Sequence, residues 1–591
     1  MALALGLAVP TTFYFPTRLP SQIRASRGSI HGRVLHTFQC IAVSLQACEQ
    51  KIVRRSANYQ PTIWDYDYVQ SLNSKYAGDA YAKQATNLKQ DVKIMLDKVV
   101  DPLVGLEMID DLQRLGVFYH FEEEIKRVLE EVYNNSFDNW KEDLRAIALK
   151  FRLMRQHGYN IHQEVFNPFK DESGNFKACL GEDVKGMLCL YEASYLSVEG
   201  ESTLEEATDF ATKNLRQSLK RKDIHHDLAM LVSHALELPL HWRVPRLEAR
   251  WFIDVYEGRP DMNPTLLQLA KLDYNIVQGT HQADLKHASR WWRGTGLGEK
   301  LSFARDRLME SFLWNAEVDF RPQFGYRRRA ATIVNALITV IDDVYDVYGT
   351  LDELELFTNA VERWDIPAMQ QLPDYMKICF LALFNSINEI GYYTLKEQGV
   401  HCIPYLQKMW ADLCQCYLVE ARWYYSGYTP TFEEYMRNAW ISISAHVILT
   451  HAYFLSTSPI TMEGLEWLEK YPNIIRWSAT ILRLADDLGT SRDEMKKGDT
   501  PKSIQCYMHE TGASEEEARE HIKYLIGETW KKMNEDRGVE SPCSQTFVEL
   551  AMNLGRMALC MYQYGDGHGA QGVETKDRVL SLLINPIPLE H

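Results

Sequence analysis

Apolar residues recur every three to four positions along the chain after Ser71, and strictly alternating runs typical of strands are few. One such face consists of Leu106, Ile109, Leu112 and Leu115, with Gly116 as a candidate end of the helix. The same spacing predicts helices over residues 143–157, 186–196, 204–219 and 226–238. We find neither a βαβ pattern nor a repeat of about 20–50 residues. The pattern therefore predicts an all-α fold.

Proline and glycine interrupt this pattern near the middle of the chain. The clearest break is residues 257–264, Glu-Gly-Arg-Pro-Asp-Met-Asn-Pro. We expect two helical domains, an N-terminal one over residues 54–260 and a C-terminal one over residues 261–591. Nearly all the candidate chemistry lies in the second.

The N-terminal segment has a different composition. No Asp or Glu occurs from Met1 to Cys48, whereas arginines recur among many Ser and Thr residues. An Arg-rich, Ser-rich and acid-free segment is typical of an organelle transit peptide. We interpret residues 1–53 as a plastid transit peptide. A mitochondrial address is the second choice, and an ordinary disordered N-terminus is the third.

Composition argues against several classes of protein. Hydrophobic residues make up 46% and charged residues 24% of the 591-residue chain, which is a globular balance. The longest apolar candidates, such as Ala331–Ile341, fall short of the ~18 residues of a membrane helix, so we expect a soluble protein without membrane insertion. The eleven cysteines are scattered, which indicates free thiols and not a disulfide framework or a zinc site.

The net charge is −16, from 64 basic and 80 acidic residues. A strongly acidic protein repels phosphate backbones, so we expect no nucleic-acid partner. An anionic substrate stays compatible with this charge if metal ions or a local group of arginines reverse its sign.

The first acidic cluster falls near the end of a helix predicted over residues 331–348. Asp342 and Asp346 share one face of that helix, and Asp343 lies one position round. Aspartate oxygens at this spacing suit Mg²⁺, which takes other ligands from water and from substrate phosphates. A solvated helix end is the alternative for this cluster alone.

A second cluster has hard-oxygen ligands along one stripe of another helix. Asp486, Thr490 and Glu494 are spaced i, i+4 and i+8. The spacing is a weak signal by itself, because acidic residues are frequent on exposed helices. Together, the two clusters predict a cleft that clamps a polyphosphate between metal ions.

Basic and aromatic residues fit the same cleft. The basic candidates for binding phosphate oxygens are Arg305, Arg307, Arg483 and Lys502. Asn335 lies two helical turns before Asp342, which predicts that this face runs from the metal site into an apolar pocket. Trp314 and Tyr562 are candidates for its wall, where an aromatic face would stabilise a cation. Surface exposure or core packing is the alternative for each residue singly.

Three motifs make the chain resemble the plant terpene synthases. They are Arg54-Arg55 followed after eight residues by Trp64, the DDxxD run Asp342-Asp343-Val344-Tyr345-Asp346, and the run Asp486-Asp487-Leu488-Gly489-Thr490-Ser491-Arg492-Asp493-Glu494. The resemblance covers residues 54–591 and is closest to angiosperm cyclic monoterpene synthases of the limonene and α-terpineol synthase type. A class II DxDD motif is missing from the sequence, since Asp65-Tyr66-Asp67 is followed by Tyr68.

The resemblance implies an N-terminal α-barrel without catalysis of its own and a C-terminal class I terpenoid-synthase fold. It implies a lyase that ionises geranyl diphosphate with about three Mg²⁺ or Mn²⁺ ions. The metal ligands would be Asp342 and Asp346 with Asp343 assisting, and Asp486, Thr490 and Glu494. Arg305, Arg483 and Lys502 would bind the diphosphate. The family default is a monomer, and its C10 pool places the enzyme in the plastid stroma.

The resemblance also implies a route through linalyl diphosphate and the α-terpinyl cation to α-terpineol, limonene or 1,8-cineole. Arg54 and Arg55 would belong to a strand that folds over the site and favours cyclic products. His568 matches a proposed terminal base, with Tyr562 nearby, although Tyr564 stands where many relatives have His.

One stretch corresponds to an interrupted helix on the pocket floor of that family. It is Ile441-Ser442-Ile443-Ser444-Ala445-His446, which places Ser444 at the substrate. We expect His446 to cap the broken turn and not to act in catalysis.

Other functions fit parts of this pattern. An acyclic monoterpene synthase (linalool, myrcene or ocimene) and a sesquiterpene synthase acting on farnesyl diphosphate are the main alternatives. A chain-elongating prenyltransferase would be expected to carry two DDxxD sites, and a non-catalytic helical scaffold would not need every metal and diphosphate position.

Overall fold

The computed structural model describes residues 54–135, 140, 142–221, 224–496, 498–539 and 541–589. The transit-peptide prediction for residues 1–53 lies outside this part of the chain. The all-α prediction is confirmed, because the described residues form helices joined by loops and no β-strand, with one isolated bridge between Lys170 and Phe176.

The helices of the N-terminal part begin and end close to the predicted positions. Asp101 caps the first of the predicted helices through the Leu103 amide, Pro102 occupies its first turn, and Gly116 follows its end with φ 71°. In order, the α-helices are α1 Tyr66–Ser71, α2 Asp79–Lys98, α3 Pro102–Arg114, α4 Glu122–Asn134, α5 Leu144–Gln156, α6 Val184–Ser194, α7 Ser202–Ser218, α8 His226–Glu237 and α9 Pro245–Glu257.

The C-terminal part starts after the predicted break, at Pro264. Its first helix, α10, is the longest at 32 residues. In order, the α-helices are α10 Pro264–Thr295, α11 Leu297–Lys300, α12 Leu308–Val318, α13 Gly325–Asp343, α14 Leu351–Arg363, α15 Ile366–Met369, α16 Asp374–Gln398, α17 Ile403–Ser426, α18 Phe432–Ser442, α19 Ala445–Ser456, α20 Met462–Glu469, α21 Asn473–Lys496, α22 Ser503–Thr511, α23 Glu515–Arg537, α24 Gln545–Met561 and α25 Val573–Val579. Two π-helical turns, Val344–Tyr348 and Leu580–Ile584, extend α13 and α25.

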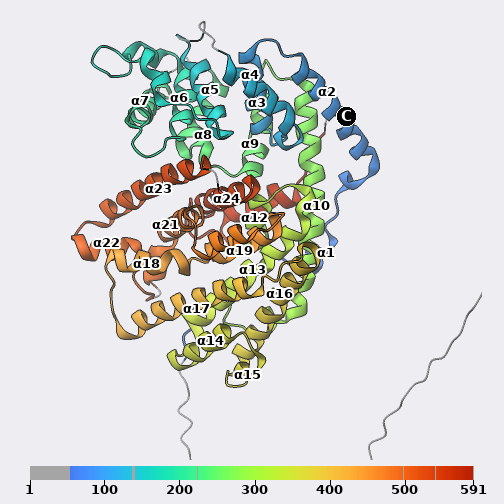
Figure 1. Cartoon of the computed structure of the whole chain (residues 1–591), viewed down its shortest axis with the longest axis vertical. Helices are drawn as coiled ribbons and strands as arrows, with labels where there is room; N and C mark the ends of the chain where they lie inside the picture. Colours follow the sequence, from blue (N-terminus) through green and yellow to red (C-terminus); the bar gives the residue numbers. More distant parts are fainter. Residues whose placement is uncertain are drawn as a thin grey trace, which may run out of the picture. The chain divides into compact units, whose positions relative to one another are not determined.

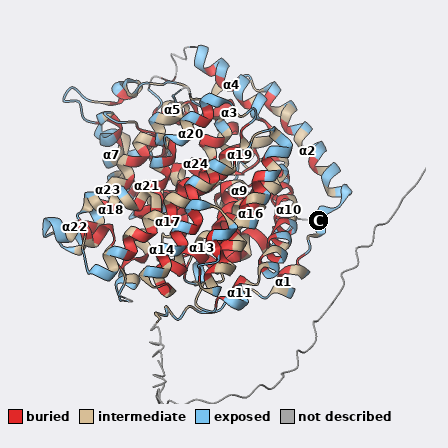
Figure 2. Ribbon diagram, turned by 60° about the horizontal axis from the view of Figure 1, so that its bottom comes forward, coloured by how far each residue is buried: buried red, intermediate tan, exposed pale blue. Residues whose placement is uncertain are grey.

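Two large hydrophobic cores, with a small third cluster of Tyr435, Ala439 and Cys506, hold the described helices together. The smaller core lies among α5, α6, α7 and α8, and the larger one runs from α1 to the C-terminal turn. Helix α10 packs against α2 of the N-terminal part and against α12 and α13 of the C-terminal part, and Figure 1 shows it along one side of both. The buried faces of the helices turn inward, toward α13, α17, α21 and α24 (Figure 2).

One described stretch, Phe432–Ser456, is long and apolar enough to cross a membrane, and 67% of its window is buried inside the protein. It consists of α18 and α19, which are separated where Ser444 adopts φ 69°. This break and burial are typical of a core helix pair. The nine cysteines in the described residues are free thiols, as predicted.

Candidate active site

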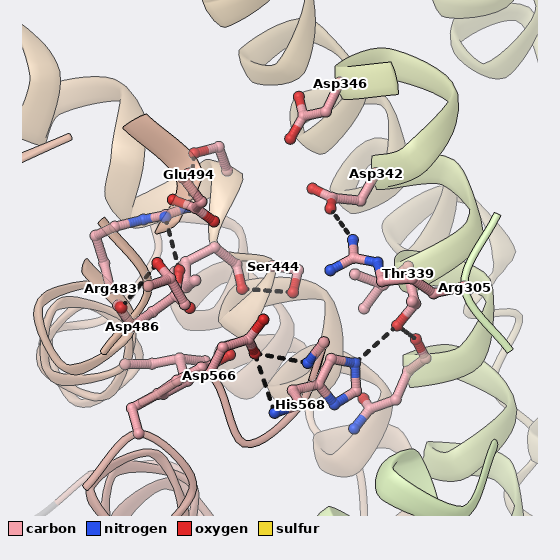
Figure 3. Close-up of a pocket in the computed structure, with 18 of the residues that line it drawn as sticks. Arg305, Thr339, Asp342, Asp346, Ser444, Arg483, Asp486, Glu494, Asp566 and His568 are labelled. Carbon is pink, nitrogen blue, oxygen red and sulfur yellow. Dashed lines mark hydrogen bonds and ion pairs between the residues drawn. The ribbon is translucent and has the colours of Figure 1, made fainter. Parts of the chain in front are cut away.

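A pocket lies between α13 and α21, the two helices that carry the acidic clusters, with α17, α18, α19 and the loop after α24 around it (Figure 3). Most of the predicted site residues line it. They are Arg305, Trp314, Asn335, Asp342, Asp346, Ser444, Arg483, Asp486, Thr490, Glu494, Lys502, Tyr562 and His568. Four predicted residues do not line this pocket: Asp343, Arg307, Arg54 and Arg55.

The first acidic wall is the C-terminal end of α13. The predicted helix over 331–348 changes to a π-turn after Asp343, so Asp346 is carried by a wider coil than Asp342. Asp342 and Asp346 point into the pocket (Figure 3). Asp343 is fully buried, and its Oδ2 accepts hydrogen bonds from the Arg305 backbone N at 2.7 Å and Nε at 3.1 Å. Asp343 therefore holds Arg305 and does not face the pocket.

The second wall, on α21, repeats this arrangement. Asp486 faces the pocket, whereas the adjacent Asp487 is fully buried and accepts hydrogen bonds from the Tyr435 hydroxyl and the Ser503 backbone N. Arg483 Nη1 bridges the two carboxylates at 3.1 and 3.3 Å. On the first wall Arg305 likewise reaches Asp342 Oδ2 at 2.5 Å as well as Asp343. Each Asp-Asp pair thus has one inward carboxylate, one buried carboxylate and one bridging arginine.

The carboxylates that face the pocket are not fully neutralised by the basic side chains around them. Burial and neighbouring carboxylates raise the pKa of Asp346 and Asp486 well above the ordinary value, and burial raises that of Glu494. Glu494 Oε2 is buried without a hydrogen-bond partner in the described chain. No three His, Cys, Asp or Glu side chains among the described residues converge closely enough to enclose an ion by themselves. The donor set fits a hard divalent cation that completes its shell with water or phosphate oxygens.

The predicted phosphate-binding cations divide into two groups. Arg305, Arg483 and Lys502 reach the pocket, and Lys502 Nζ lies 3.3 Å from Asp499 Oδ2 and 3.8 Å from Glu494 Oε2. Arg307 points elsewhere: its guanidinium donates to the backbone carbonyls of Gly569, at 3.0 and 3.1 Å, and of Gln60. The position of Arg307 therefore does not support the prediction that it binds substrate. Its side chain instead links the loop at Gly569 to the N-terminal segment at Gln60.

Beyond the acidic walls, the pocket is lined by aromatic and apolar side chains. The Trp314 ring lies 6.2 Å from the Tyr562 ring and 6.3 Å from the His568 ring. His568 Nε2 is 3.0 Å from Thr339 Oγ1, and burial with nearby arginines lowers its pKa to about 3, so the imidazole is neutral. Asn335 Oδ1 is buried and accepts no hydrogen bond from the described residues.

The floor of the pocket is the break between α18 and α19. Ser444 and its neighbour Ile443 line the pocket there, and Ser444 has a left-handed backbone. The interrupted helix is therefore confirmed. His446 does not cap the broken turn: its Nε2 lies 3.0 Å from the Met409 carbonyl of α17, and the side chain is fully buried outside the pocket lining. It joins two helices.

Residues 54–64 are extended but pair with no other strand among the described residues, and we call them the N-terminal strand. They contact the π-turn after α13, the start of α14 and Arg305. Arg54 forms two hydrogen bonds of 2.8 Å with Glu353 and one of 2.9 Å with the carbonyl of Tyr348, the last residue of the π-turn. Arg55 stacks on the Tyr424 ring at 3.9 Å. Tyr59 lies over the Arg305 guanidinium, 5.0 Å from ring centroid to Cζ. The arginine pair anchors the strand, and Tyr59 is the residue of the strand that reaches the acidic wall.

Sequence reasoning missed several lining residues. Thr339 lies between Asn335 and Asp342 at helical spacing, so that spacing could have identified it. Asp566, whose Oδ1 accepts from the His568 and Gly569 amides, and Glu420, which accepts from the Ser442 hydroxyl at 2.6 Å, carry no pattern that marks them. Tyr564 is exposed and contacts Glu237, away from the pocket.

Comparison with known proteins shows the family to which the chain belongs. Residues 63–236 match the model "Terpene synthase, N-terminal domain", and residues 293–532 match "Terpene synthase family, metal binding domain". The (-)-alpha-terpineol synthase of Vitis vinifera is 63% identical over 591 residues, 100% of this chain and 99% of that protein. The chain belongs to the terpene synthase family. Terpene synthases are lyases, so the chain is an enzyme.

Other terpene synthases are similarly close. The chloroplastic myrcene synthase of Quercus ilex is 63% identical over 562 residues, 95% of this chain and 94% of that protein. A limonene synthase solved with 2-fluorolinalyl diphosphate has a TM-score of 0.89 at 49% identity, covering 91% of this chain and 100% of the solved one. Isoprene synthase from Populus x canescens, solved with three Mg²⁺ ions and dimethylallyl-S-thiolodiphosphate, has a TM-score of 0.83 at 48% identity, covering 89% and 99%. The relatives therefore include synthases named for both cyclic and acyclic products, and the two-domain helical fold is confirmed.

Proposed function

We propose that this terpene synthase ionises geranyl diphosphate and cyclises the resulting cation to monocyclic monoterpenes. The observation that carries the proposal is the continuity of one pocket, from two facing acidic walls with bridging arginines to an aromatic end formed by Trp314 and Tyr562. Such a pocket suits a substrate with a diphosphate at the charged end and a hydrocarbon chain at the aromatic end. The limonene synthase solved with 2-fluorolinalyl diphosphate supports a C10 substrate.

The charged end holds the leaving group. Asp342 and Asp346 on one wall, and Asp486, Thr490 and Glu494 on the other, would hold Mg²⁺ or Mn²⁺, about three ions in all as in the poplar isoprene synthase structure. Bound there, the ions supply electrostatic stabilisation of the departing diphosphate. Arg305, Arg483 and Lys502 add fixed positive charge at the same end. Asp343 takes part by positioning Arg305.

The apolar end controls the carbocation. The faces of Trp314 and Tyr562 stabilise positive charge by about 2 kcal/mol when water is excluded. The strand anchored by Arg54 covers the site, which keeps water away while linalyl diphosphate forms and closes to the α-terpinyl cation. His568, whose imidazole is neutral and whose Nδ1 has no hydrogen-bond partner in the described chain, would accept the proton in the last step.

Of the two alternatives, an acyclic product and a C15 substrate, only the first has support from a relative. An acyclic product is favoured by the similarity to a myrcene synthase. A C15 substrate would need a longer apolar end of the pocket. The myrcene synthase relative is named chloroplastic, which supports a plastid location and therefore a C10 substrate for this chain. We place the enzyme in the plastid stroma and expect it to act as a monomer.

The test uses residues 54–591 with geranyl diphosphate and Mg²⁺, followed by gas chromatography and mass spectrometry. Cyclic C10 products that disappear with EDTA are expected. Mostly acyclic C10 products would refute the cyclisation proposal, and turnover of farnesyl diphosphate alone would refute the substrate and the plastid location together.

A further inference from the structure

A second cavity, of about 200 Å³, lies at the junction of the N-terminal and C-terminal helices. Helices α3, α5 and α9 line one side of it, and α23 and α24 line the other. It shares no lining residue with the pocket between the acidic clusters. The proposed reaction leaves it without a role.

This cavity has the opposite charge from the protein as a whole. Its lining holds twice as many arginines as carboxylates, in a chain with a net charge of −16. The arginines are Arg114, Arg152, Arg243, Arg321, Arg537 and Arg556, and the carboxylates are Glu248, Asp319 and Glu549.

Four of these arginines have carboxylate partners. Arg114 and Arg152 pair with Asp110 and Glu192, Arg243 lies 3.7 Å from Glu248, and Arg321 lies 2.9 Å from Glu549. Arg537 and Arg556 form no ion pair with any residue that the structure describes. They are the exceptions in the cavity.

The contacts of these two arginines are neutral. Arg556 Nε donates to the His241 carbonyl at 2.8 Å, and its Nη1 donates to Asn553 Oδ1 at 2.8 Å. Arg537 Nη2 donates to the Gln156 carbonyl. Each guanidinium has five N–H groups, so both keep donors that no described residue accepts.

Desolvation makes this arrangement costly without a counter-ion. Desolvation and the charge of Arg537 lower the pKa of Arg556 to about 9, although the Glu549 carboxylate, which pairs with Arg321, acts to raise it. The adjacent His241 is fully buried, burial and Arg556 lower its pKa well below the ordinary value, and its Nδ1 has no partner in the described chain. Both arginine side chains are half-buried, and an anion bound between the two guanidinium groups would offset the repulsion between them.

We propose that this cavity binds a small oxyanion of the phosphate class, held by Arg537 from α23 and Arg556 from α24 at the junction with the N-terminal helices. Guanidinium forks match phosphate oxygens in pairs, and two forks from different helices give a site for one such ion. The ion is orthophosphate or the diphosphate that the proposed reaction releases. Because it binds the folded protein only, it stabilises the junction by mass action.

The test measures the thermal midpoint and the binding isotherm of the full chain in low-salt buffer with EDTA, against orthophosphate and diphosphate. EDTA removes the metal on which the acidic pocket depends for diphosphate binding. The wild type is expected to show a saturable rise in midpoint. Arg556→Gln and Arg537→Gln are each expected to weaken binding at least tenfold. Without added anion, Arg556→Gln is expected to match or exceed the wild-type midpoint, since it removes a half-buried charge that is repelled by Arg537. This result separates lost binding from poor folding.

Two further variants locate the ion. Arg437→Gln removes an exposed arginine on α18 that pairs with Glu433, and Arg483→Gln removes an arginine of the acidic pocket. Both are expected to keep the anion response. Binding of diphosphate but not orthophosphate supports the site with the reaction product as ligand. A response that is lost in Arg483→Gln and kept in Arg556→Gln, or no saturable response to either anion, overturns the proposal.

Discussion

Replacing the two adjacent aspartates of each pair separately should change stability to very different extents. Asp343 is fully buried and bonded to Arg305, whereas Asp342 faces the pocket beside Asp346. Asp343→Asn leaves the Arg305 guanidinium without its buried counter-charge. Asp342→Asn removes one of several carboxylates that repel each other, and Arg305 keeps Asp343 as partner.

The magnitude follows from burial. Removing one partner of a buried ion pair costs about 3–5 kcal/mol, because the other charge stays buried and unpaired. In Asp343→Asn the side-chain amide oxygen would still accept from the Arg305 backbone amide, so we expect the lower end, about 3 kcal/mol. For Asp342→Asn we expect a change within about 0.5 kcal/mol, because the lost ion pair with Arg305 is offset by the relieved repulsion from Asp346.

The assay is the thermal midpoint in EDTA together with the Mg²⁺ dependence of turnover. Asp343→Asn should lower the midpoint, and Asp342→Asn should leave it unchanged but raise the Mg²⁺ concentration needed for half-maximal rate. The matched variants on the other wall, Asp487→Asn and Asp486→Asn, should divide in the same way. Equal stability of Asp343→Asn and Asp342→Asn, with equal loss of Mg²⁺ response, would refute the division of roles.

Three other perturbations test the site. Gly569→Ala would place a Cβ 2.5 Å from Asp566 Oδ2 and 3.2 Å from Arg305 Nη1, and a displacement of about 1 Å should lower kcat about 100-fold, whereas Gly527→Ala, with nothing within 4 Å, should not. Arg54→Ala removes the bonds to Glu353 and should raise the acyclic share of the products with little change in the thermal midpoint, as should Glu353→Gln; an unchanged product profile would contradict the covering role of the strand. In EDTA the midpoint should rise as pH falls from 8 toward 6, because the raised folded-state pKa values of Asp346 and Asp486 make the native state bind protons that the unfolded state releases. Mg²⁺ and the substitution Asp346→Asn should each reduce this dependence of the midpoint on pH. A dependence that neither of them changes would contradict the role of these carboxylates.

Sequence reasoning predicted the helices well because their apolar faces have a clear period. Asp101, Pro102 and Gly116 at the ends of α3 are signals of the same local kind. The π-turn after Asp343 could not be predicted, because a one-residue widening of the coil leaves the hydrophobic pattern almost unchanged. Spacing placed Asp342 and Asp346 on one face of the helix, but it did not show that Asp343 points away from the pocket and contacts Arg305.

The directions of single charged side chains were the least predictable part of the site. Arg305 and Arg307 flank the same residue in sequence, yet one reaches the pocket and the other binds the Gly569 and Gln60 carbonyls. Long-range packing decides between them, since both partners of Arg307 lie more than 240 residues away in sequence. Asp566 and Tyr59 also reach the site through long-range packing, because both lie in irregular segments whose sequence has no helical or strand periodicity.

The anchoring of the N-terminal strand sets an order in folding. Arg54 meets Glu353 across 299 residues, and residues 54–64 form no helix that could be stable before that contact exists. The strand can dock only after the π-turn and the start of α14 have their final positions, because those elements supply its partners. The most distant contacts in sequence form late, when the loop they close has already been shortened by the rest of the fold. We therefore expect residues 54–64 to dock after the helices that supply their partners, and to detach without unfolding those helices.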